Sequence, residues 1–475
     1  MTTAEQAPAA TLPGARAAAD TGTPAPLGKR GRPRELGLLA CTALVVGNMI
    51  GSGVFLLPGA LARYGGLALV AWGFTSAGAL LLALVFARFS TMYPDTGGPY
   101  AYVQRVFGDR IGFFTGWGYW IAVWVGNAAI AIAAVSYLAY FVEPLAHHRF
   151  LGAVIAAALS WAATLLNIRG VGSAGVVSIV LTALKLIPLV GIAVVGLFFL
   201  DRGSVPEFNP GGGSAAAGVT SAATLTLWAF VGMESATVPA GSVRDPRRTI
   251  PRATVLGVVL AASVYVLGTF VVMTLVPAAE LADSPAPFAA AARVLVGAAG
   301  GWIVAAGGLI ACLGAMVGWV MMQGQIPLAA ARDGLFPRPF ARLDANGTPA
   351  FGLIASNVLV TLLILSTAGG GLADQFERII LIATTISLVP YGLTAIALLR
   401  LLRTDRAAFA GPALVKYGLI AVLAAAYSIW AVVGSGWTVI WQGLVLLALG
   451  GPVYVWLTRR RAADRPVGDH SGTKG

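Results

Sequence analysis

Charged residues, cysteine and histidine are all scarce in this chain of 475 residues. Asp, Glu, Lys and Arg together make up 11% of it, whereas an average soluble domain has about 25%. A soluble fold of this length would lack the charge needed to cover its surface, which excludes that class of protein. The two cysteines and three histidines have no metal-ligand spacing, so we expect no disulfide framework, no metal and no cofactor.

Hydrophobic residues take the place of the missing charge and make up 58% of the chain. Apolar stretches of about 20 residues recur along it, and each is long enough to cross roughly 30 Å of hydrocarbon. The sequence therefore predicts an all-α membrane protein with twelve transmembrane helices. We expect them at residues 38–62, 66–92, 111–142, 150–168, 174–200, 218–240, 253–276, 300–328, 350–367, 376–399, 413–433 and 437–457.

Three regions of the chain differ in composition. Residues 1–36 are rich in Ala, Pro, Thr and Gly, end in a basic cluster and lack the apolar core of a signal peptide. This composition predicts a disordered cytoplasmic arm. Residues 37–458 form the helical domain, and residues 459–475 are expected to be a basic cytoplasmic tail.

The formal net charge of +12 raises the question of nucleic-acid binding, and the positions of the basic residues answer it. With a cytoplasmic N-terminus, nearly all Lys and Arg residues fall in cytoplasmic segments, as the positive-inside rule predicts. Both termini are then cytoplasmic, and no nucleic acid is expected as a partner. The exceptions are Arg63, Arg149, Arg202, Arg293 and Arg378 in the outer loops, and the intramembrane Lys185.

An internal repeat is visible in the first and sixth predicted helices. Gly51–Gly53 is followed by Pro58, and Gly232 is followed by Pro239 at the same seven-residue offset. Helix breakers in the middle of a membrane are tolerated where they line a cavity, and matching interruptions in two halves point to a transporter site. Each half has five helices, so the second copy is inverted. The halves span about 38–200 and 218–400, with the helices of 413–457 outside the repeat.

The segment Gly47–Gly53 carries the first candidate site. Its glycines can unwind the helix and leave backbone N–H groups unpaired. Such groups at the N-terminus of a half-helix bind anions and suit a carboxylate. The alternative is a face of small residues for close helix packing.

Two ionisable residues are predicted at mid-membrane depth. Glu234 is the acidic one, and an acid there is costly unless it faces water, takes a proton or finds a partner. Its alternative is a structural carboxyl that bonds the backbone. Carbonyl groups freed near Gly232 are suited to bind an α-ammonium group. Lys185 either braces the broken first helix or is a cation that titrates because of its burial.

Seven segments between about residue 38 and residue 457 carry a family resemblance. On these segments the chain resembles the amino acid–polyamine–organocation superfamily. It is most similar to its basic amino acid/polyamine antiporter family, which includes the bacterial arginine–agmatine antiporters. The segments are GNMIGSGVFLLP, GGPYAYVQRVFG, YWIAVWVGN, LWAFVGMESA, GWVMMQGQ, RDGLFP and LVPYG.

The resemblance implies a LeuT-like fold of two inverted five-helix repeats with discontinuous first and sixth helices. It implies a multi-pass transporter of the bacterial inner membrane and not an enzyme, with lipid around it and a homodimer contact through the last two helices. By the same resemblance, substrate binding is assigned to Asn48, Met49, Gly51, Ser52, Gly53, Ala122, Val123, Asn127, Trp228, Val231, Trp319 and Ala383.

Within that set, the resemblance gives each group a role. The amides of Asn48–Gly53 hold the substrate carboxylate, the carbonyls of Trp228 and Val231 hold the α-ammonium group, and Trp319 stacks on a guanidinium. Gating or proton-linked roles are assigned to Tyr100, Tyr119, Trp228, Glu234, Tyr391 and Lys185. Val123, Ile130, Ala315 and Ala383 depart from the more polar or more flexible residues that line this pocket in the family.

These observations predict a secondary active amino-acid transporter that works by alternating access. The expected reaction exchanges a basic amino acid for its decarboxylated amine, as in arginine/agmatine antiport. The alternative is a proton-coupled permease for neutral or broad-range amino acids, with Lys185 and Glu234 as titrating groups. The expected partners are small amino acid and amine substrates.

Overall fold

The computed structural model describes residues 36–94, 97–170, 174–200, 205–238, 240–405, 409 and 411–463. The predicted N-terminal arm apart from Leu36, most of the basic tail and Pro239 lie outside the described residues.

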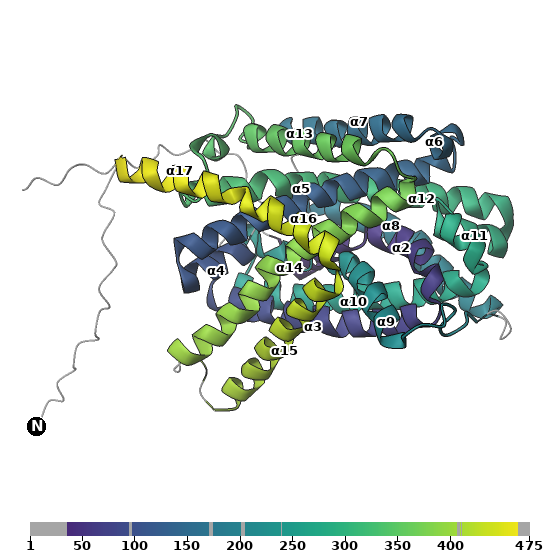
Figure 1. The fold of residues 1–475 in the computed structure, drawn as a ribbon, viewed down its shortest axis with the longest axis horizontal. Coiled ribbons are helices and arrows are strands. Elements are labelled where there is room, and N and C mark those ends of the chain that lie inside the picture. The colour runs from purple at the N-terminus through teal and green to yellow at the C-terminus, as the bar shows by residue number, and fades with distance from the viewer. Residues whose placement is uncertain are drawn as a thin grey trace, which may run out of the picture. The chain divides into compact units, whose positions relative to one another are not determined.

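Helices are the regular elements in the described part of the chain, and one isolated bridge joins Leu36 and Val243 (Figure 1). The first half contains α1 (Leu38–Met49), α2 (Ser52–Leu61), α3 (Leu67–Met92), α4 (Pro99–Phe107), α5 (Asp109–Ala139), α6 (Pro144–His147), α7 (Arg149–Ile168) and α8 (Ala174–Gly196). The second half contains α9 (Ala215–Leu227), α10 (Pro246–Leu275), α11 (Ala278–Asp283), α12 (Pro287–Arg332), α13 (Ala350–Thr367) and α14 (Leu372–Thr404). The chain then continues through α15 (Pro412–Gly434), α16 (Trp437–Ala448) and α17 (Gly450–Ala463).

Among the described residues, eleven segments are long and apolar enough to cross a membrane. The prediction of an all-α membrane protein is thereby confirmed. The predicted helix at 174–200 corresponds to α8 and the 3₁₀ turn Leu197–Phe199 that follows it, of which Ala183–Phe199 forms a shorter apolar stretch. The exact number of twelve spans therefore stays a prediction.

Two predicted helices are less regular than their apolar runs indicated. Helix α12 contains a break at Val296 and Gly297, where φ of the glycine is +74°, and then continues through the predicted span to Arg332. The predicted last helix is divided into α16 and α17, which meet near Leu449. Hydrophobicity predicted where these spans lie, but not where the helices are interrupted.

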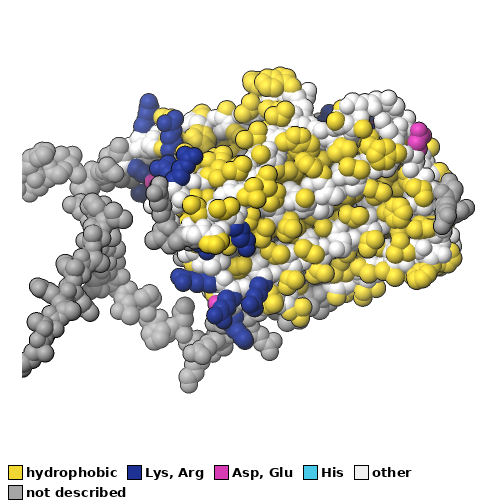
Figure 2. Space-filling view, turned by 90° about the horizontal axis from the view of Figure 1, so that it is seen from below, with side chains coloured by type: hydrophobic (Ala, Val, Ile, Leu, Met, Phe, Trp, Pro, Cys, Tyr) yellow, Lys and Arg dark blue, Asp and Glu magenta, His cyan; other side chains and the backbone are white. Residues whose placement is uncertain are grey.

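Helix α5 occupies the core because it is apolar on all sides and packs against both α12 and α14. Helices α7 and α13 lie side by side, and α10 packs along α3 (Figure 1). Outer helices expose large apolar side chains, such as Ile187, Val415 and Trp437. Figure 2 shows hydrophobic atoms over most of one face, with Lys and Arg gathered towards one end. This surface suits a hydrocarbon environment bounded by a basic edge.

Candidate functional site

The first predicted helix is interrupted between α1 and α2. Ile50 (ψ 98°) and Gly51 (φ −151°, ψ −133°) have non-helical backbone, so α2 begins afresh at Ser52. A Cβ atom at Gly51 would lie 3.0 Å from the Cβ of Ala315, so a larger residue would crowd α12. The predicted break is confirmed, but Pro58 lies inside α2 and does not form it.

Side chains from distant helices satisfy carbonyl groups that the break leaves without helical donors. The ammonium Nζ of Lys185 donates to the carbonyl oxygen of Gly47. The indole Nε1 of Trp319 donates to the carbonyl oxygen of Asn48 at 3.0 Å. Because the last carbonyls of a helix need outside partners, these bonds stabilise the interrupted backbone. Of the two roles predicted for Lys185, this contact matches the brace.

The sixth predicted helix is interrupted as well. Helix α9 ends at Leu227, a short 3₁₀ turn follows at Trp228–Phe230, and Val231 has extended backbone (ψ 131°). Gly232 then has φ +102°, a conformation that favours glycine. A Cβ atom there would also lie 3.2 Å from the ring of Trp319. This predicted break is confirmed.

The two breaks face each other. A Cβ atom at Gly53 would lie 3.1 Å from the Cα of Ala229, which shows how closely the backbones approach. The indole Nε1 of Trp228 donates to Ser52 Oγ at 3.3 Å. The amide Nδ2 of Asn48 donates to Ser235 Oγ at 2.8 Å. Segments far apart in sequence therefore share one polar centre.

Trp228 and Trp319 form an aromatic pair beside this centre. Their ring centroids are 6.0 Å apart, with an angle of 34° between the planes. A Cβ atom at Gly126 of α5 would lie 2.8 Å from the Trp228 ring and 3.7 Å from that of Trp319. The small glycine therefore lets both rings lie against α5.

Asn127 follows this glycine and binds Gln323, which lies one turn beyond Trp319 on α12. Asn127 Nδ2 donates to Gln323 Oε1 at 2.7 Å. Within the described part of the chain, Asn127 Oδ1 and Gln323 Nε2 are buried and have no hydrogen-bond partner. Unsatisfied buried polar atoms are costly, so this amide pair is a candidate contact for a ligand.

Glu234 is fully buried and binds two tyrosines from different helices. Tyr119 of α5 donates to its Oε1 at 2.7 Å, and Tyr391 of α14 donates to its Oε2 at 2.6 Å. The Tyr391 hydroxyl also accepts the Gly232 N–H at 3.3 Å. The structure thus brings together three of the residues with predicted gating or proton-linked roles, directly beside the break in the sixth helix.

The remaining predicted binding residues form apolar surroundings. Met49 is buried at the end of α1, and Ala122 and Val123 are buried on α5. Ala383 is buried on α14. The departures from the family pattern at Ile130 and Ala315 are buried too. At these positions only backbone atoms can form hydrogen bonds.

A pocket of about 440 Å³ leads from this centre to an exposed surface. Its buried end includes Asn48 and Ser235, and its exposed end includes Arg332 and Asp333. Tyr100, predicted as a gate residue, lies in the wall and donates its hydroxyl to Asp333 Oδ2 at 3.2 Å. This bond joins α4 to the end of α12. Burial raises the pKa of the Asp333 carboxyl above its ordinary value of 3.8, although the Tyr100 hydrogen bond opposes the shift.

Sequence reasoning missed three polar residues of this arrangement: Asp333, Gln323 and Ser235. Each lies in a segment that carried the family resemblance, RDGLFP, GWVMMQGQ or LWAFVGMESA. Polarity within an apolar run was the available signal for Gln323 and Ser235. Asp333 gave no such signal, because acidic residues are common just beyond helix ends.

Comparisons with known proteins agree with this geometry. Residues 36–457 match the family model described as amino acid permease. The chain is 38% identical to a cadaverine/lysine antiporter of Escherichia coli strain K12, over 77% of this chain and 84% of the relative. It is 32% identical to a putative arginine/ornithine antiporter of Bacillus subtilis strain 168, over 90% and 98% of the two chains.

A third relative is the putrescine transporter PotE of Escherichia coli strain K12, which is 29% identical over 89% of this chain and 96% of its own. The family match covers nearly all of the helical domain, including both interrupted helices. The protein is therefore a multi-pass membrane transporter and not an enzyme, and it belongs to the basic amino acid/polyamine antiporters of the amino acid permease family.

Proposed function

We propose that this protein exchanges a basic amino acid for its decarboxylated amine across the bacterial inner membrane by alternating access. The observation that carries the proposal is the pair of facing helix breaks around Asn48, Gly232 and Trp319, with Glu234 buried beside them. The proposal includes a twelve-span fold with two inverted five-helix repeats. The named relatives support an amino acid and an amine as the two substrates.

The carboxylate of the amino acid would bind at the start of α2. Gly51 precedes this helix and has no side chain to cap it, so the first-turn amides at Ser52, Gly53 and Val54 are available to an anion. The α-ammonium group would bind the carbonyl oxygens of Trp228 and Val231, at the turn between α9 and the extended backbone.

The distal cation of the substrate would lie against Trp319, with Asn127 Oδ1 accepting a hydrogen bond from it. An aromatic face attracts a guanidinium or an ammonium group, and a free amide oxygen suits either. The sequence pointed to arginine and agmatine, while one relative is named for lysine and cadaverine. Both pairs share the required chemistry, with a cation at the end of an aliphatic stem.

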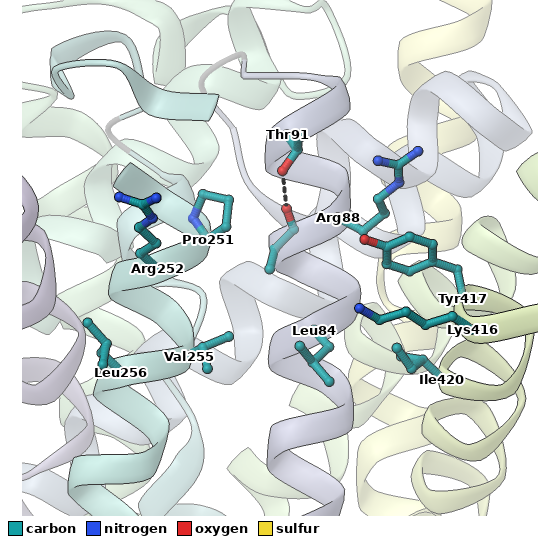
Figure 3. Close-up of a pocket in the computed structure, with 11 residues that line it drawn as sticks. Leu84, Arg88, Thr91, Pro251, Arg252, Val255, Leu256, Lys416, Tyr417 and Ile420 are labelled. Carbon is teal, nitrogen blue, oxygen red and sulfur yellow. Dashed lines mark hydrogen bonds between the residues drawn. The ribbon is translucent and has the colours of Figure 1, made fainter. Parts of the chain in front are cut away.

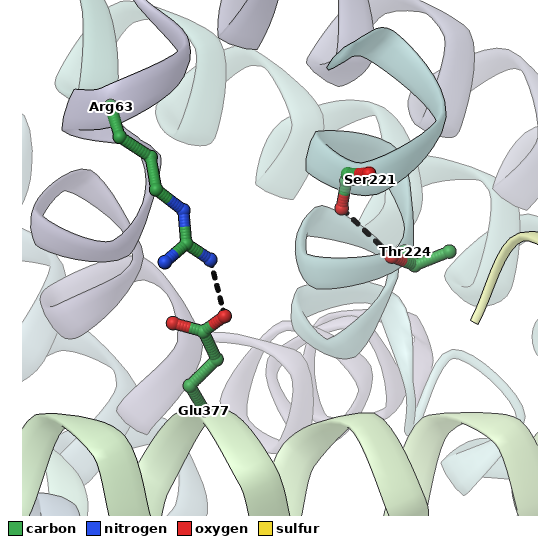
Figure 4. Close-up of polar contacts among 4 residues, drawn as sticks. All are labelled: Arg63, Ser221, Thr224 and Glu377. Atoms are coloured by element: carbon green, nitrogen blue, oxygen red, sulfur yellow. Dashed lines mark hydrogen bonds and ion pairs between the residues drawn. The ribbon is translucent and has the colours of Figure 1, made fainter. Parts of the chain in front are cut away.

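The pocket beside Tyr100 supports access from the basic edge, which the positive-inside rule assigns to the cytoplasm. The opposite end of the site carries an ion pair between Arg63, just beyond α2, and Glu377 of α14 (Figure 4). We infer an inward-facing conformation in which this ion pair helps to close the outer side.

Counterflow in proteoliposomes tests the exchange. Vesicles with purified protein are loaded with agmatine, cadaverine or putrescine, and uptake of labelled arginine, lysine or ornithine is measured. We expect rapid uptake only where the internal amine matches the external amino acid. Uptake into empty vesicles driven by an imposed pH gradient would instead support the proton-coupled permease.

That second candidate rests on the buried Lys185 and its bond to the Gly47 carbonyl. A lysine that gains and loses a proton at this position would couple protonation to the backbone conformation between α1 and α2. Lys185→Met distinguishes the two candidates, because it abolishes gradient-driven uptake in a permease. In an exchanger we expect it to lower the rate without altering the requirement for internal amine.

Glu377→Gln should favour the outward-facing conformation, because it removes the charge that pairs with Arg63. An exposed ion pair contributes about 0–1 kcal/mol, so the external KM for the amino acid should fall by up to about fivefold. The measurement is uptake at varied external substrate concentration. Glu280→Gln is the control, since Glu280 is also exposed and pairs with Arg293 at 2.8 Å instead of with Arg63. An equal effect of both variants contradicts a specific closing role.

Asp333→Asn should remove a pH dependence of stability. The folded protein holds the Asp333 proton more tightly than the unfolded chain, so this stabilisation is full below pH 3.8 and is lost as pH rises through the raised pKa. Thermal unfolding between about pH 4 and pH 7 should show a decline with pH in the wild type that the variant reduces. Asp283→Asn, outside the pocket, is the control. Parallel curves for Asp333→Asn and the wild type would exclude this titration.

A further inference from the structure

A second pocket, of about 470 Å³, lies between α3, α10 and α15 (Figure 3). Each of the three helices contributes one basic side chain to it: Arg88, Arg252 and Lys416. Apolar side chains line the part of the pocket below these cations in Figure 3, namely Leu84, Val255, Leu256 and Ile420. The pocket therefore combines a cationic rim with an apolar wall.

The pocket opens on the apolar outer surface and not into the transport site. Leu256 is 46% exposed, and Val415 and Leu419 next to the pocket on α15 are 74% and 60% exposed. In a membrane protein such side chains face the lipid. The cations belong to the ends of their helices, at the edge that the positive-inside rule assigns to the cytoplasm.

The charges in the pocket complement an anion. No carboxylate is among the residues that line it, and within the described part of the chain Arg252 and Lys416 form no ion pair. The starts of α10 and α15, near Pro246 and Pro412, add the positive end of two helix dipoles.

Two aromatic rings hold the side chain of Arg88 in place at this rim. Its guanidinium lies 4.8 Å from the ring centroid of Tyr417 and 4.6 Å from that of Phe409. Lys416 Nζ lies 5.7 Å from the same Tyr417 ring. The two cations therefore lie against the same aromatic side chain.

We propose that this pocket binds the headgroup of an anionic phospholipid from the surrounding bilayer. The phosphate would lie at the cationic rim to which Arg252 and Lys416 belong, with the acyl chains along the apolar wall that includes Leu256 and Ile420. Basic pockets between transmembrane helices at the cytoplasmic edge are suited to such headgroups. The bound lipid would tie α10, which follows the interrupted sixth helix, to α3 and α15. The site does not depend on which substrate the protein carries.

Native mass spectrometry of the full-length protein in detergent tests the proposal, with dioleoyl phosphatidylglycerol added as the probe. We expect Arg252→Gln combined with Lys416→Gln to lower the lipid-bound fraction at least threefold. The control is Arg342→Gln combined with Arg403→Gln, two exposed basic residues that do not line the pocket. It should bind as the wild type does. Leu256→Trp fills the apolar wall, keeps every charge and should also lower binding.

Three results would overturn the proposal. One is equal loss in the control double variant, which indicates general surface charge. Another is equal binding of dioleoyl phosphatidylcholine, which has no net charge. The third is displacement of the lipid by millimolar inorganic phosphate, which indicates a site for a free anion. Should the double variant fail to fold, the Leu256→Trp result decides the question by itself.

Discussion

Glu234→Gln is expected to lower the exchange rate at least about tenfold and to flatten its dependence on pH. The carboxyl group accepts one hydrogen bond from Tyr119 and one from Tyr391, and both bonds end on the same buried group. Hydrogen bonds to a charged group contribute about 1.5–3 kcal/mol each, more than bonds to a neutral amide. Glutamine keeps the size of the side chain but cannot ionise. Initial exchange rates in proteoliposomes over a range of pH provide the measurement.

Tyr391→Phe and Glu280→Gln are the controls for this prediction. Tyr391→Phe removes one donor and leaves the carboxyl able to titrate, so its pH profile should keep its form at a reduced rate. Glu280→Gln changes an exposed carboxylate outside the site and should have no effect on either quantity. If Glu234→Gln lowers the rate but keeps the wild-type pH profile, then Glu234 has a structural role and no part in proton linkage.

Trp319→Leu is expected to weaken substrate binding by roughly 1–2 kcal/mol, or about 5- to 30-fold in Kd. The indole would provide the aromatic face for the distal cation, and leucine has no such face. Trp319 also donates a hydrogen bond to the Asn48 carbonyl, so the substitution removes two interactions. Calorimetric titration of arginine, lysine and their amines into purified protein measures the change.

Trp319→Phe separates these two interactions, because it keeps an aromatic ring and loses the N–H group. If cation–π stacking dominates, Trp319→Phe should bind within about threefold of the wild type. If it loses as much affinity as Trp319→Leu, the bond to Asn48 is the important contact. Trp302→Leu, at a half-exposed tryptophan on the lipid side of α12, is the matched control. An unchanged Kd for Trp319→Leu would exclude this residue from the site.

Much of the architecture followed from composition and from a few small residues. Long apolar runs predicted the helical segments, because a membrane interior requires every backbone group to be paired within its own helix. Gly51 and Gly232 predicted where two helices break, because glycine within an apolar run weakens a helix. The structure has a close approach to Ala315 at the first position and φ +102° at the second. Glu234 was also identified from the sequence, because an ionisable group within an apolar membrane segment is costly unless it has a function or a partner.

Other features could come only from contacts between distant segments. The sequence showed Lys185 as a buried cation but not its acceptor, the Gly47 carbonyl on another helix. Asp333 looked like an ordinary residue after a helix, and its bond to Tyr100 depends on how α4 meets the end of α12. Hydrophobicity is local along the chain and reports only whether a segment can lie within the membrane. The partner of a buried polar atom depends on the rotation and depth of each helix, and packing among all the helices sets both.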